Sequence, residues 1–279
     1  MFGIRNRIWQ RVKKVIGEGQ SSRLWTTLDE YSCHYHLLYE NANNHNALSN
    51  GEAEVLRRLA SIGELNVALD VGANVGDYTS LLYNLNSECR VYSFEPQPEV
   101  YKRLLKRFAG NLNNINLYNY GLSDRAESAE LAIPYQSTGK GSLLKEKQLA
   151  IGRECYDLTI RLKVGDDFLQ KQQIESTISI VKVDVEGWES RVIKGFVNSL
   201  ERINVIQFEY TKAALFSRYF LHDYYRDYGK YFHIGKIYPK GVRFMPEYDA
   251  SKSIDSLLDS NYIMVNKDRK DNIIEVLSL

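Results

Sequence analysis

The chain has 279 residues, a formal net charge of +1 and a hydrophobic fraction of 44%. This hydrophobic fraction is typical of a globular protein with an apolar core, and the length fits one α/β domain with additions or two small domains. A net charge this close to zero provides no strong field for nucleic acid, so we expect no nucleic-acid partner. No apolar stretch approaches the ~18 residues of a membrane span, and we therefore expect neither a membrane-spanning helix nor a signal peptide.

Three cysteines, Cys33, Cys89 and Cys155, share no metal-ligand spacing. An odd number of thiols without such a pattern is most simply explained by reduced cysteines, which indicates a cytoplasmic location.

Residues 1–20 are basic and amphipathic, with Ile8, Trp9 and Val12 on the apolar side and Arg5 and Lys14 mostly elsewhere. The spacing predicts a helix that docks on protein, because amphipathic helices usually bury their apolar face there. The alternative is peripheral contact with an anionic membrane surface.

Residues 21–50 are polar and tyrosine-rich, and we expect them to be helical in part, with a loop over residues 41–50. The apolar spacing of residues 52–62 then predicts a helix. We therefore divide the chain into an N-terminal helical extension, residues 1–50, and a main domain, residues 51–279.

The main domain begins with a strand, a glycine turn and a helix. The apolar run at residues 67–71 predicts a strand buried on both faces, with Asp70 near its carboxyl end. The turn GANVG, with Gly72 and Gly76, is neither the GxGxxG nor the GxxxxGK[ST] phosphate motif. An acidic residue before such a turn disfavours a phosphate and favours a positively charged nucleoside, such as S-adenosylmethionine. The alternative is a packing turn that binds nothing.

The second strand, residues 91–94, ends at Glu95 and is stopped by Pro96, and a helix follows up to residue 108. A carboxylate at the end of the second strand of such a sheet can accept hydrogen bonds from both ribose hydroxyls. The alternative for Glu95 is a solvated strand end.

Residues 115–120 read as the third strand, followed by a turn over residues 121–124. The turn after this strand can reach the adenine edge, through a backbone amide and the carboxylate of Asp124. The alternative is that Asp124 only caps its own turn.

Two additional short strands are expected at residues 129–134 and 158–164, separated by a polar loop, residues 135–147, and followed by a helix at residues 165–173. Gly139 and Gly141 make this loop either a mobile lid over the acceptor or simply disordered.

The fourth central strand, residues 178–183, ends at Asp184, with Glu186 in the turn, and a helix is expected over residues 188–197. The next strand, residues 203–208, ends at Glu209. Lys182 interrupts the apolar run and can pair with one of these carboxylates. The alternative is that the carboxylates are solvated strand ends. A helical segment at residues 216–231 and strands at residues 232–238 and 261–265 complete the expected elements.

The motifs LDVGANVGDYTSLL, YSFEPQPE, NYGLSD, VKVDVEGWESRVIKGF and VIQFEY occur in this order over roughly residues 67–210. The series resembles the FkbM family of S-adenosylmethionine-dependent methyltransferases. The resemblance implies an α/β fold, with a doubly wound, Rossmann-like sheet of seven strands whose last strand runs antiparallel. It also implies methyl transfer to a hydroxyl oxygen of a saccharide, a polyketide or a similar small molecule.

The candidate site residues form two groups. The expected catalytic residues are Asp184, Glu186 and Glu209, with Asp184 or Glu186 as the base or as the group that orients the acceptor. The expected cofactor-binding residues are Asp70, Gly72, Ala73, Asn74, Gly76, Glu95, Pro96, Gly121, Leu122, Asp124 and Asp184. A divalent metal ion such as Mg²⁺, bound by Asp184 and Glu209, is an alternative for which no third ligand is evident.

Other function classes are weighed against the same motifs. A dehydrogenase would need the GxGxxG turn, and a nitrogen methyltransferase on nucleic acid would usually show an NPPY-like tetrad and a basic face; the sequence has none of these. A scaffold that keeps the fold without catalysis remains the main alternative.

Overall fold

The computed structural model describes residue 10 and residues 12–17, 22–110, 113–136, 140–249, 257–268 and 271–279. The chain divides into two units, Met1–Ala42 and Asn43–Leu279. Most of residues 1–20, expected to form an amphipathic helix, lie outside the described residues. In the first unit, α2 (Arg23–Tyr39) begins where the Ser22 hydroxyl accepts a hydrogen bond from the Trp25 backbone N–H.

The second unit is built around an eight-stranded sheet with the order β10-β9-β11-β8-β7-β1-β2-β3. Its parallel part consists of β3 (Ile115–Tyr118), β2 (Arg90–Phe94), β1 (Val67–Val71), β7 (Ile178–Val183) and β8 (Ile203–Tyr210). The chain runs outward from β1 in one direction and later resumes from β7 in the other. The point between β1 and β7 is therefore the switch point at which such sheets bind ligands.

The antiparallel part confirms the expected reversal of the last strand. β11 (Ser260–Asn266) lies between β8 and β9 (Phe232–Tyr238) and is antiparallel to both. The sheet has one strand more than the seven expected, because β10 (Gly241–Met245) pairs with β9 as a hairpin. This strand was missed because its exposed Arg243 breaks the apolar pattern of a buried strand.

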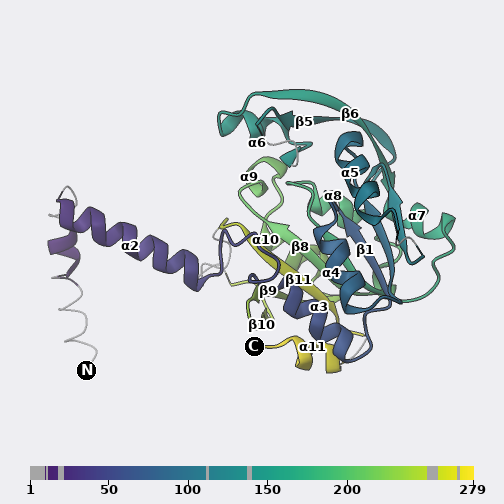
Figure 1. Cartoon of the computed structure of the whole chain (residues 1–279). Coiled ribbons are helices and arrows are strands. Elements are labelled where there is room, and N and C mark those ends of the chain that lie inside the picture. The colour runs from purple at the N-terminus through teal and green to yellow at the C-terminus, as the bar shows by residue number, and fades with distance from the viewer. Residues whose placement is uncertain are drawn as a thin grey trace. The chain divides into compact units, whose positions relative to one another are not determined.

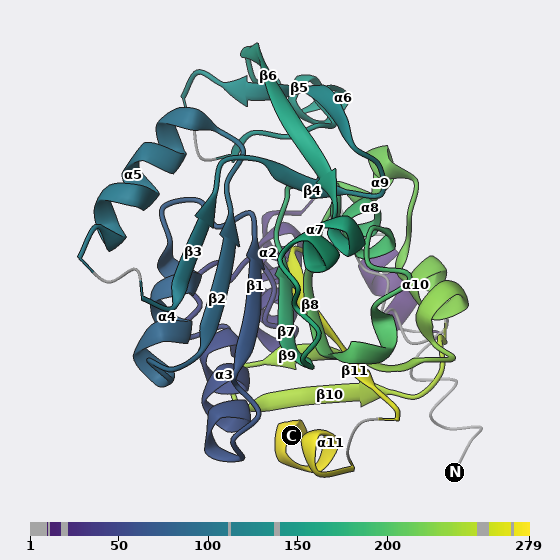
Figure 2. The same ribbon diagram turned by 90° about the vertical axis from the view of Figure 1, so that its right-hand side faces the viewer.

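Helices cover both faces of the central sheet (Figures 1 and 2). One apolar cluster joins Ala68 of β1 to four helices: α3 (Glu52–Ser61), α4 (Asp77–Leu85), α5 (Pro98–Phe108) and α11 (Asp271–Leu277). The other joins the adjacent Leu69 to α7 (Gly165–Lys171), α8 (Glu189–Lys194) and α10 (Leu221–Tyr228). Neighbouring residues of a strand point to opposite faces, so the continuous apolar run of β1 supplies both layers.

A smaller sheet of three strands adjoins the central one, with the order β4-β6-β5. It consists of β4 (Gly121–Ser123), β5 (Glu127–Pro134) and β6 (Cys155–Val164), and α6 (Lys145–Ala150) lies in the segment between the last two. Figure 2 shows this sheet and α6 above the end of the central sheet.

Two local expectations for these segments were wrong. Residues 121–123 are not a turn, because they are buried and pair in parallel with β6. The expected polar loop over residues 135–147 ends in the first residues of α6 instead of remaining irregular throughout. Gly139 lies outside the described residues, so the predicted mobility at that position is not described.

The segment after β8 also differs from the expectation of one long helix. It contains α9 (Ala214–Ser217) and α10, separated at Arg218, whose φ of +55° is left-handed and ends α9. Before β8, a short 3-10 helix, η2 (Leu200–Arg202), leads into the strand. Across the ranges described above, no helix is both long and apolar enough to cross a membrane.

Candidate active site

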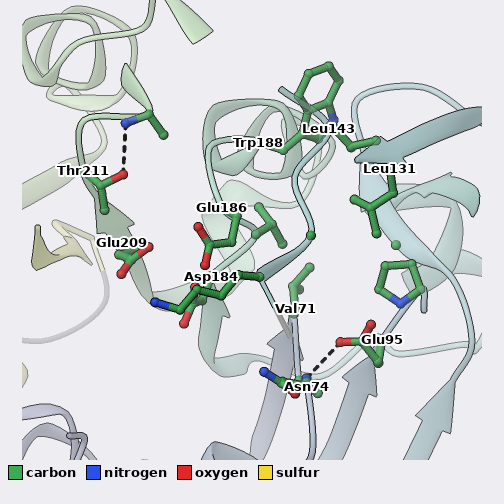
Figure 3. Close-up of a pocket in the computed structure, with 18 of the residues that line it drawn as sticks. Val71, Asn74, Glu95, Leu131, Leu143, Asp184, Glu186, Trp188, Glu209 and Thr211 are labelled. Carbon is green, nitrogen blue, oxygen red and sulfur yellow. Dashed lines mark hydrogen bonds between the residues drawn. The ribbon is translucent and has the colours of Figure 1, made fainter. Parts of the chain in front are cut away.

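A cavity of about 650 Å³ opens at the carboxyl ends of the central strands, where the second sheet adjoins them. Strand ends supply Val71, Glu95, Asp184 and Glu209, and the second sheet supplies Leu131, Ile160 and Leu162. Figure 3 shows Glu95 and Asn74 at one side of the cavity and Asp184, Glu186 and Glu209 at the other. The volume falls within the range of small-molecule sites and suffices for a nucleoside together with part of an acceptor.

The glycine turn after β1 passes very close to the end of β7. Gly72 has a φ of +86°, and a Cβ atom there would lie 1.8 Å from the carbonyl oxygen of Asp184. The Asp184 N–H donates in turn to the carbonyl of Val71, over 3.0 Å. Only glycine fits this position, and the turn is therefore held at the switch point of the sheet.

The rest of this turn divides between the cavity and the core. Gly72, Ala73 and Asn74 line the cavity. Gly76, with a φ of +90°, does not line it; a Cβ atom there would lie 2.5 Å from the Phe108 ring. Gly76 therefore allows α4 to begin against α5, and its contribution is to packing.

Glu95 lies at the end of β2 and lines the cavity although it is almost fully buried. Its Oε2 accepts from the Asn74 N–H over 3.0 Å, and its Oε1 accepts from the Gln97 N–H over 2.8 Å. Burial raises the pKa of the Glu95 carboxyl to about 7, although both backbone donors favour its charged form. Each carboxylate oxygen keeps a second lone pair that can accept a hydrogen bond from a hydroxyl group.

Asp70 does not line the cavity, contrary to the expectation that it contacts the ligand directly. It is fully buried, and its Oδ2 accepts from the Thr79 hydroxyl over 2.7 Å. Its Oδ1 has no hydrogen-bond partner among the residues that the structure describes. Burial raises the pKa of Asp70, while the ammonium of Lys182 and the Thr79 hydroxyl oppose this shift. The residue lies beneath the turn and ties β1 to α4.

A cluster of carboxylates surrounds Lys182 near the end of β7. The Lys182 ammonium is almost fully buried and lies 3.0 Å from Oδ2 of Asp184. Burial disfavours its charge, yet its pKa is raised because Asp184, Asp70 and Glu52 surround it. The expected pairing of Lys182 with a strand-end carboxylate is thus confirmed.

Glu186 has a φ of +56°, a left-handed conformation that is unusual for this residue type. Two residues of the segment around α6 hold it. Lys147 Nζ lies 2.6 Å from its Oε2, and the Ser142 hydroxyl donates to its carbonyl oxygen over 2.7 Å. Strained residues held in this way cluster at functional sites.

Glu209 is the next-to-last residue of β8, the strand that neighbours β7, and it lines the same cavity. Burial raises the pKa of Glu209 well above its usual value, and the negative charges of Asp184 and Glu186 raise it further. At neutral pH this carboxyl is therefore protonated more readily than an exposed glutamate.

The expected adenine-binding residues are separated by the structure. Gly121 and Leu122 line the cavity next to Pro96. Asp124 does not line it, and instead pairs with Arg191 at 2.8 Å and with Lys194 at 3.7 Å. The aspartate therefore joins β4 to α8 and is not positioned to contact a ligand in the cavity.

Several lining residues were not identified from the sequence. Glu52, the first residue of α3, is buried and hydrogen-bonds Asn50 at 2.7 Å and the side chain of Gln207. An acidic residue in the first turn of a helix is common, so its sequence position contains no signal for a site. Trp188 and Lys147 also line the cavity. The DVEGW motif places Trp188 close to the expected site and was the only available signal for it.

The polar groups that line the cavity are suited to a cationic nucleoside. Glu95 offers a carboxylate for two vicinal hydroxyls, and the turn over Gly72 and Asn74 supplies close backbone without a phosphate-binding lysine. The ranges described in the structure contain no group of three or more His, Cys, Asp or Glu residues arranged to hold a metal ion.

The curated proteins that are similar to this chain include three methyltransferases. It is 28% identical over 160 residues to "Hexuronic acid methyltransferase AglP" of Haloferax volcanii, an alignment that covers 56% of this chain and 61% of that protein. It is 26% identical over 165 residues to "2-O-methyltransferase NoeI" of Sinorhizobium fredii, covering 54% and 65%. It is 29% identical over 152 residues to "Methyltransferase sdnD" of Sordaria araneosa, covering 46% and 59%. The chain spans about three fifths of the length of these relatives.

Residues 70–231, more than half of the chain, match the family described as "Methyltransferase FkbM domain". The match begins at Asp70 of β1 and extends through β8 to α10, so it contains the strand ends that line the cavity. The chain belongs to the FkbM methyltransferase family.

Proposed function

We propose that this chain is an S-adenosylmethionine-dependent O-methyltransferase that acts on a hydroxyl group of a saccharide or a similar small molecule. The observation that carries the proposal is a single cavity with Glu95 at one side and Asp184, Glu186 and Glu209 at the other. The carboxylate proposed to bind the nucleoside and the carboxylates proposed to bind the acceptor thus line the same cavity. The printed names of the relatives, which refer to a hexuronic acid and to 2-O-methylation, support a saccharide acceptor.

The proposed cofactor contacts come from three strand ends. Glu95 accepts hydrogen bonds from the two ribose hydroxyls, because it lines the cavity and each of its oxygens has a second lone pair. The backbone of Gly72, Ala73 and Asn74 contacts the methionyl part of S-adenosylmethionine. Pro96, Gly121 and Leu122 enclose the adenine. When bound, S-adenosylmethionine supplies an electrophilic methyl group.

The proposed acceptor contacts come from β7 and β8. Asp184 pairs with Lys182 at 3.0 Å and can accept the proton of an acceptor hydroxyl or orient that hydroxyl. Glu186 is the second candidate base and is held by Lys147. The acceptor oxygen must lie ~3 Å from the methyl carbon and in line with the bond that breaks, so positioning by these side chains supplies much of the rate.

Titration calorimetry with S-adenosylhomocysteine tests the proposal first. We expect saturable binding, and no comparable binding of NAD, because the turn lacks the dinucleotide fingerprint. Transfer of a radiolabelled methyl group to a panel of saccharides tests the reaction itself. A chain that binds no S-adenosylhomocysteine at millimolar concentration would be a scaffold, and the proposal would be abandoned.

The same assay decides the role of a metal ion. Treatment with EDTA leaves the rate unchanged if the carboxylates act directly on the acceptor. A loss of rate that added Mg²⁺ restores would assign Asp184 and Glu209 to the metal instead.

We also propose that the enzyme works in the cytoplasm. The thiols of Cys33, Cys89 and Cys155 are free. Free thiols are typical of a reducing compartment.

A further inference from the structure

Basic side chains line the same cavity as the carboxylates, and two of them already have partners. Lys182 pairs with Asp184 at 3.0 Å, and Lys147 pairs with Glu186 at 2.6 Å. These two pairs neutralise the strand-end carboxylates of β7 and of the turn that follows it. The cavity wall also contains Glu52, Glu95, Glu209 and Asp259, which are not part of these two ion pairs.

Lys140, Arg153 and Lys212 are the remaining lysine and arginine residues of the cavity wall. Among the residues that the structure describes, none of these three forms an ion pair with a carboxylate. They come from three separate segments: the loop before α6, the loop after α6 and the segment after β8. Cations that form no ion pair with a carboxylate around one cavity favour an anionic ligand.

A buried glutamine holds two of these segments together. Gln148 of α6 is fully buried, and its Nε2 donates to the carbonyl oxygen of Lys140 over 2.8 Å. Its Oε1 accepts from Nη1 of Arg153 over 3.4 Å, and its own carbonyl accepts from the Arg153 N–H over 3.1 Å. Lys140 and Arg153 are thus fixed to the same short helix, with the Arg153 guanidinium held at the cavity wall.

Resting on the proposed function, we propose that Arg153, Lys140 and Lys212 bind an anionic group of the methyl acceptor. A carboxylate suits this set best, because the planar guanidinium can donate two parallel hydrogen bonds to its two oxygens. The preferred acceptors are then acidic saccharides, and neutral saccharides are poor ones. S-adenosylmethionine also has a carboxylate. The experiment must therefore distinguish binding of the acceptor carboxylate from binding of the cofactor carboxylate.

Binding of D-glucuronate and of D-glucose to the full chain, measured by calorimetry with and without saturating S-adenosylhomocysteine, tests this inference. The two sugars differ only at C6, where one has a carboxylate. We expect glucuronate to bind at least about tenfold more tightly. The double variant Arg153→Gln/Lys140→Gln should lose this preference and keep its affinity for S-adenosylhomocysteine. Lys212→Gln alone should reduce the preference in part.

Lys171→Gln provides the matched control, because Lys171 is an exposed lysine at the end of α7 and does not line the cavity. It should behave as the unmodified chain in every measurement. Thermal unfolding of each variant shows that the fold is intact, and Lys212→Gln replaces the double variant if that one unfolds.

Three results would overturn the inference. The first is glucuronate binding no tighter than glucose, including no measurable binding of either. The second is an unchanged preference in the variants. The third is a tenfold loss of S-adenosylhomocysteine affinity in the double variant, which would assign the cations to the cofactor. Failure of the proposed function is a different result, since the unmodified chain would then bind no S-adenosylhomocysteine at all.

Discussion

Two acidic residues at the ends of neighbouring strands, Asp70 and Glu95, have different roles despite similar sequence positions. Asp70 is enclosed beneath the glycine turn and bonded to Thr79. Glu95 follows the last residue of β2, and its side chain reaches the cavity while backbone N–H groups hold both of its oxygens. In the parallel register of β1 and β2, Asp70 lies opposite Ser93, so Glu95 lies two residues nearer the carboxyl ends of the strands. This offset brings Glu95 to the cavity and leaves Asp70 in the core.

Replacement of Glu95 by glutamine should weaken S-adenosylhomocysteine binding by roughly ten- to hundredfold, since hydrogen bonds to a charged acceptor contribute about 1.5–3 kcal/mol. The side-chain amide of the new glutamine also places its NH2 group against the backbone N–H of Asn74 or Gln97, and two donors cannot form a hydrogen bond with each other. Calorimetry measures the loss. Glu99→Gln is the control, because Glu99 is exposed on α5, pairs with Lys102 at 2.6 Å and does not line the cavity. Equal affinity of Glu95→Gln and the unmodified chain would contradict the ribose role.

The affinity for S-adenosylhomocysteine should also depend on pH. Burial raises the pKa of Glu95 to about 7, and ribose hydroxyls bind its ionised form better. Affinity should therefore be constant above this pH and decrease as the pH falls through about 7, by at most about tenfold per pH unit. Calorimetry from pH 5.5 to 8.5 checks the curve. The Glu95→Gln variant should lose this decrease, and a variant that keeps it would point to another titrating group.

Replacement of Asp184 by asparagine should lower kcat by roughly tenfold or more and leave S-adenosylhomocysteine affinity largely intact, because the amide cannot take a proton from the acceptor. Steady-state methyl transfer and calorimetry on the same preparation check this pair of effects. Asp167→Asn, on the exposed part of α7, is the control. An unchanged kcat would remove Asp184 from the chemistry.

At the scale of elements, the site depends on how closely the turn after β1 approaches the end of β7. The second sheet then adds residues to the wall, and the segment between β5 and β6 holds the turn after β7 through Ser142 and Lys147. Figure 1 shows α6 and β5 on the same side of the molecule as α8 and α9. Chain segments far apart in sequence thus determine the position of Glu186.

Gly72→Ala tests the close approach of β1 and β7. The new Cβ atom would lie 1.8 Å from the carbonyl oxygen of Asp184, and the backbone there has a φ of +86°. We expect a loss of roughly 3 kcal/mol or more in the free energy of unfolding. Urea denaturation measures it.

Gly63→Ala is the matched control for this prediction. Gly63 has a φ of +72° and open space around a Cβ atom, so the left-handed backbone alone should cost about 1–2 kcal/mol. A similar loss in both variants would show that contact with Asp184 adds nothing.

At the scale of the whole molecule, the chain forms two units, Met1–Ala42 and Asn43–Leu279. Every residue that lines the cavity belongs to the second unit, including His45 and Ala47, which precede α3. The sequence placed the boundary at residue 50, within the loop that supplies these two residues. The proposed extent of the methyltransferase domain therefore begins earlier, at residue 43.

Two truncations distinguish these boundaries. Removal of residues 1–42 should leave a folded chain that binds S-adenosylhomocysteine with unchanged affinity, since the second unit contains the whole cavity. Removal of residues 1–50 also deletes Asn50, which is buried and bonded to Glu52 at 2.7 Å, and should lower the stability and the affinity. Circular dichroism and calorimetry compare the two. Equal behaviour of both truncations would favour the boundary at residue 50.

Much of the fold could be predicted because apolar runs and glycine turns act locally. Strands β1 and β7 match the predicted residues 67–71 and 178–183. Strand β4 could not be predicted, because its three residues form a strand only by pairing with β6, about forty residues later. The candidate site followed from strand ends for Glu95, Asp184 and Glu209. Glu52 and Arg153 could not be predicted because only tertiary packing brings them to the cavity.

The amino-acid sequence by itself determined the α/β class, the parallel core strands and the FkbM family, because buried strands need continuous apolar runs and each motif lies within one stretch of chain. The tertiary structure alone decided which carboxylates face the cavity. It buried Asp70, paired Asp124 with Arg191, and placed Arg153 and Lys140 on one wall through Gln148. The direction and the partners of a side chain depend on segments distant in sequence, and local patterns contain no information about them.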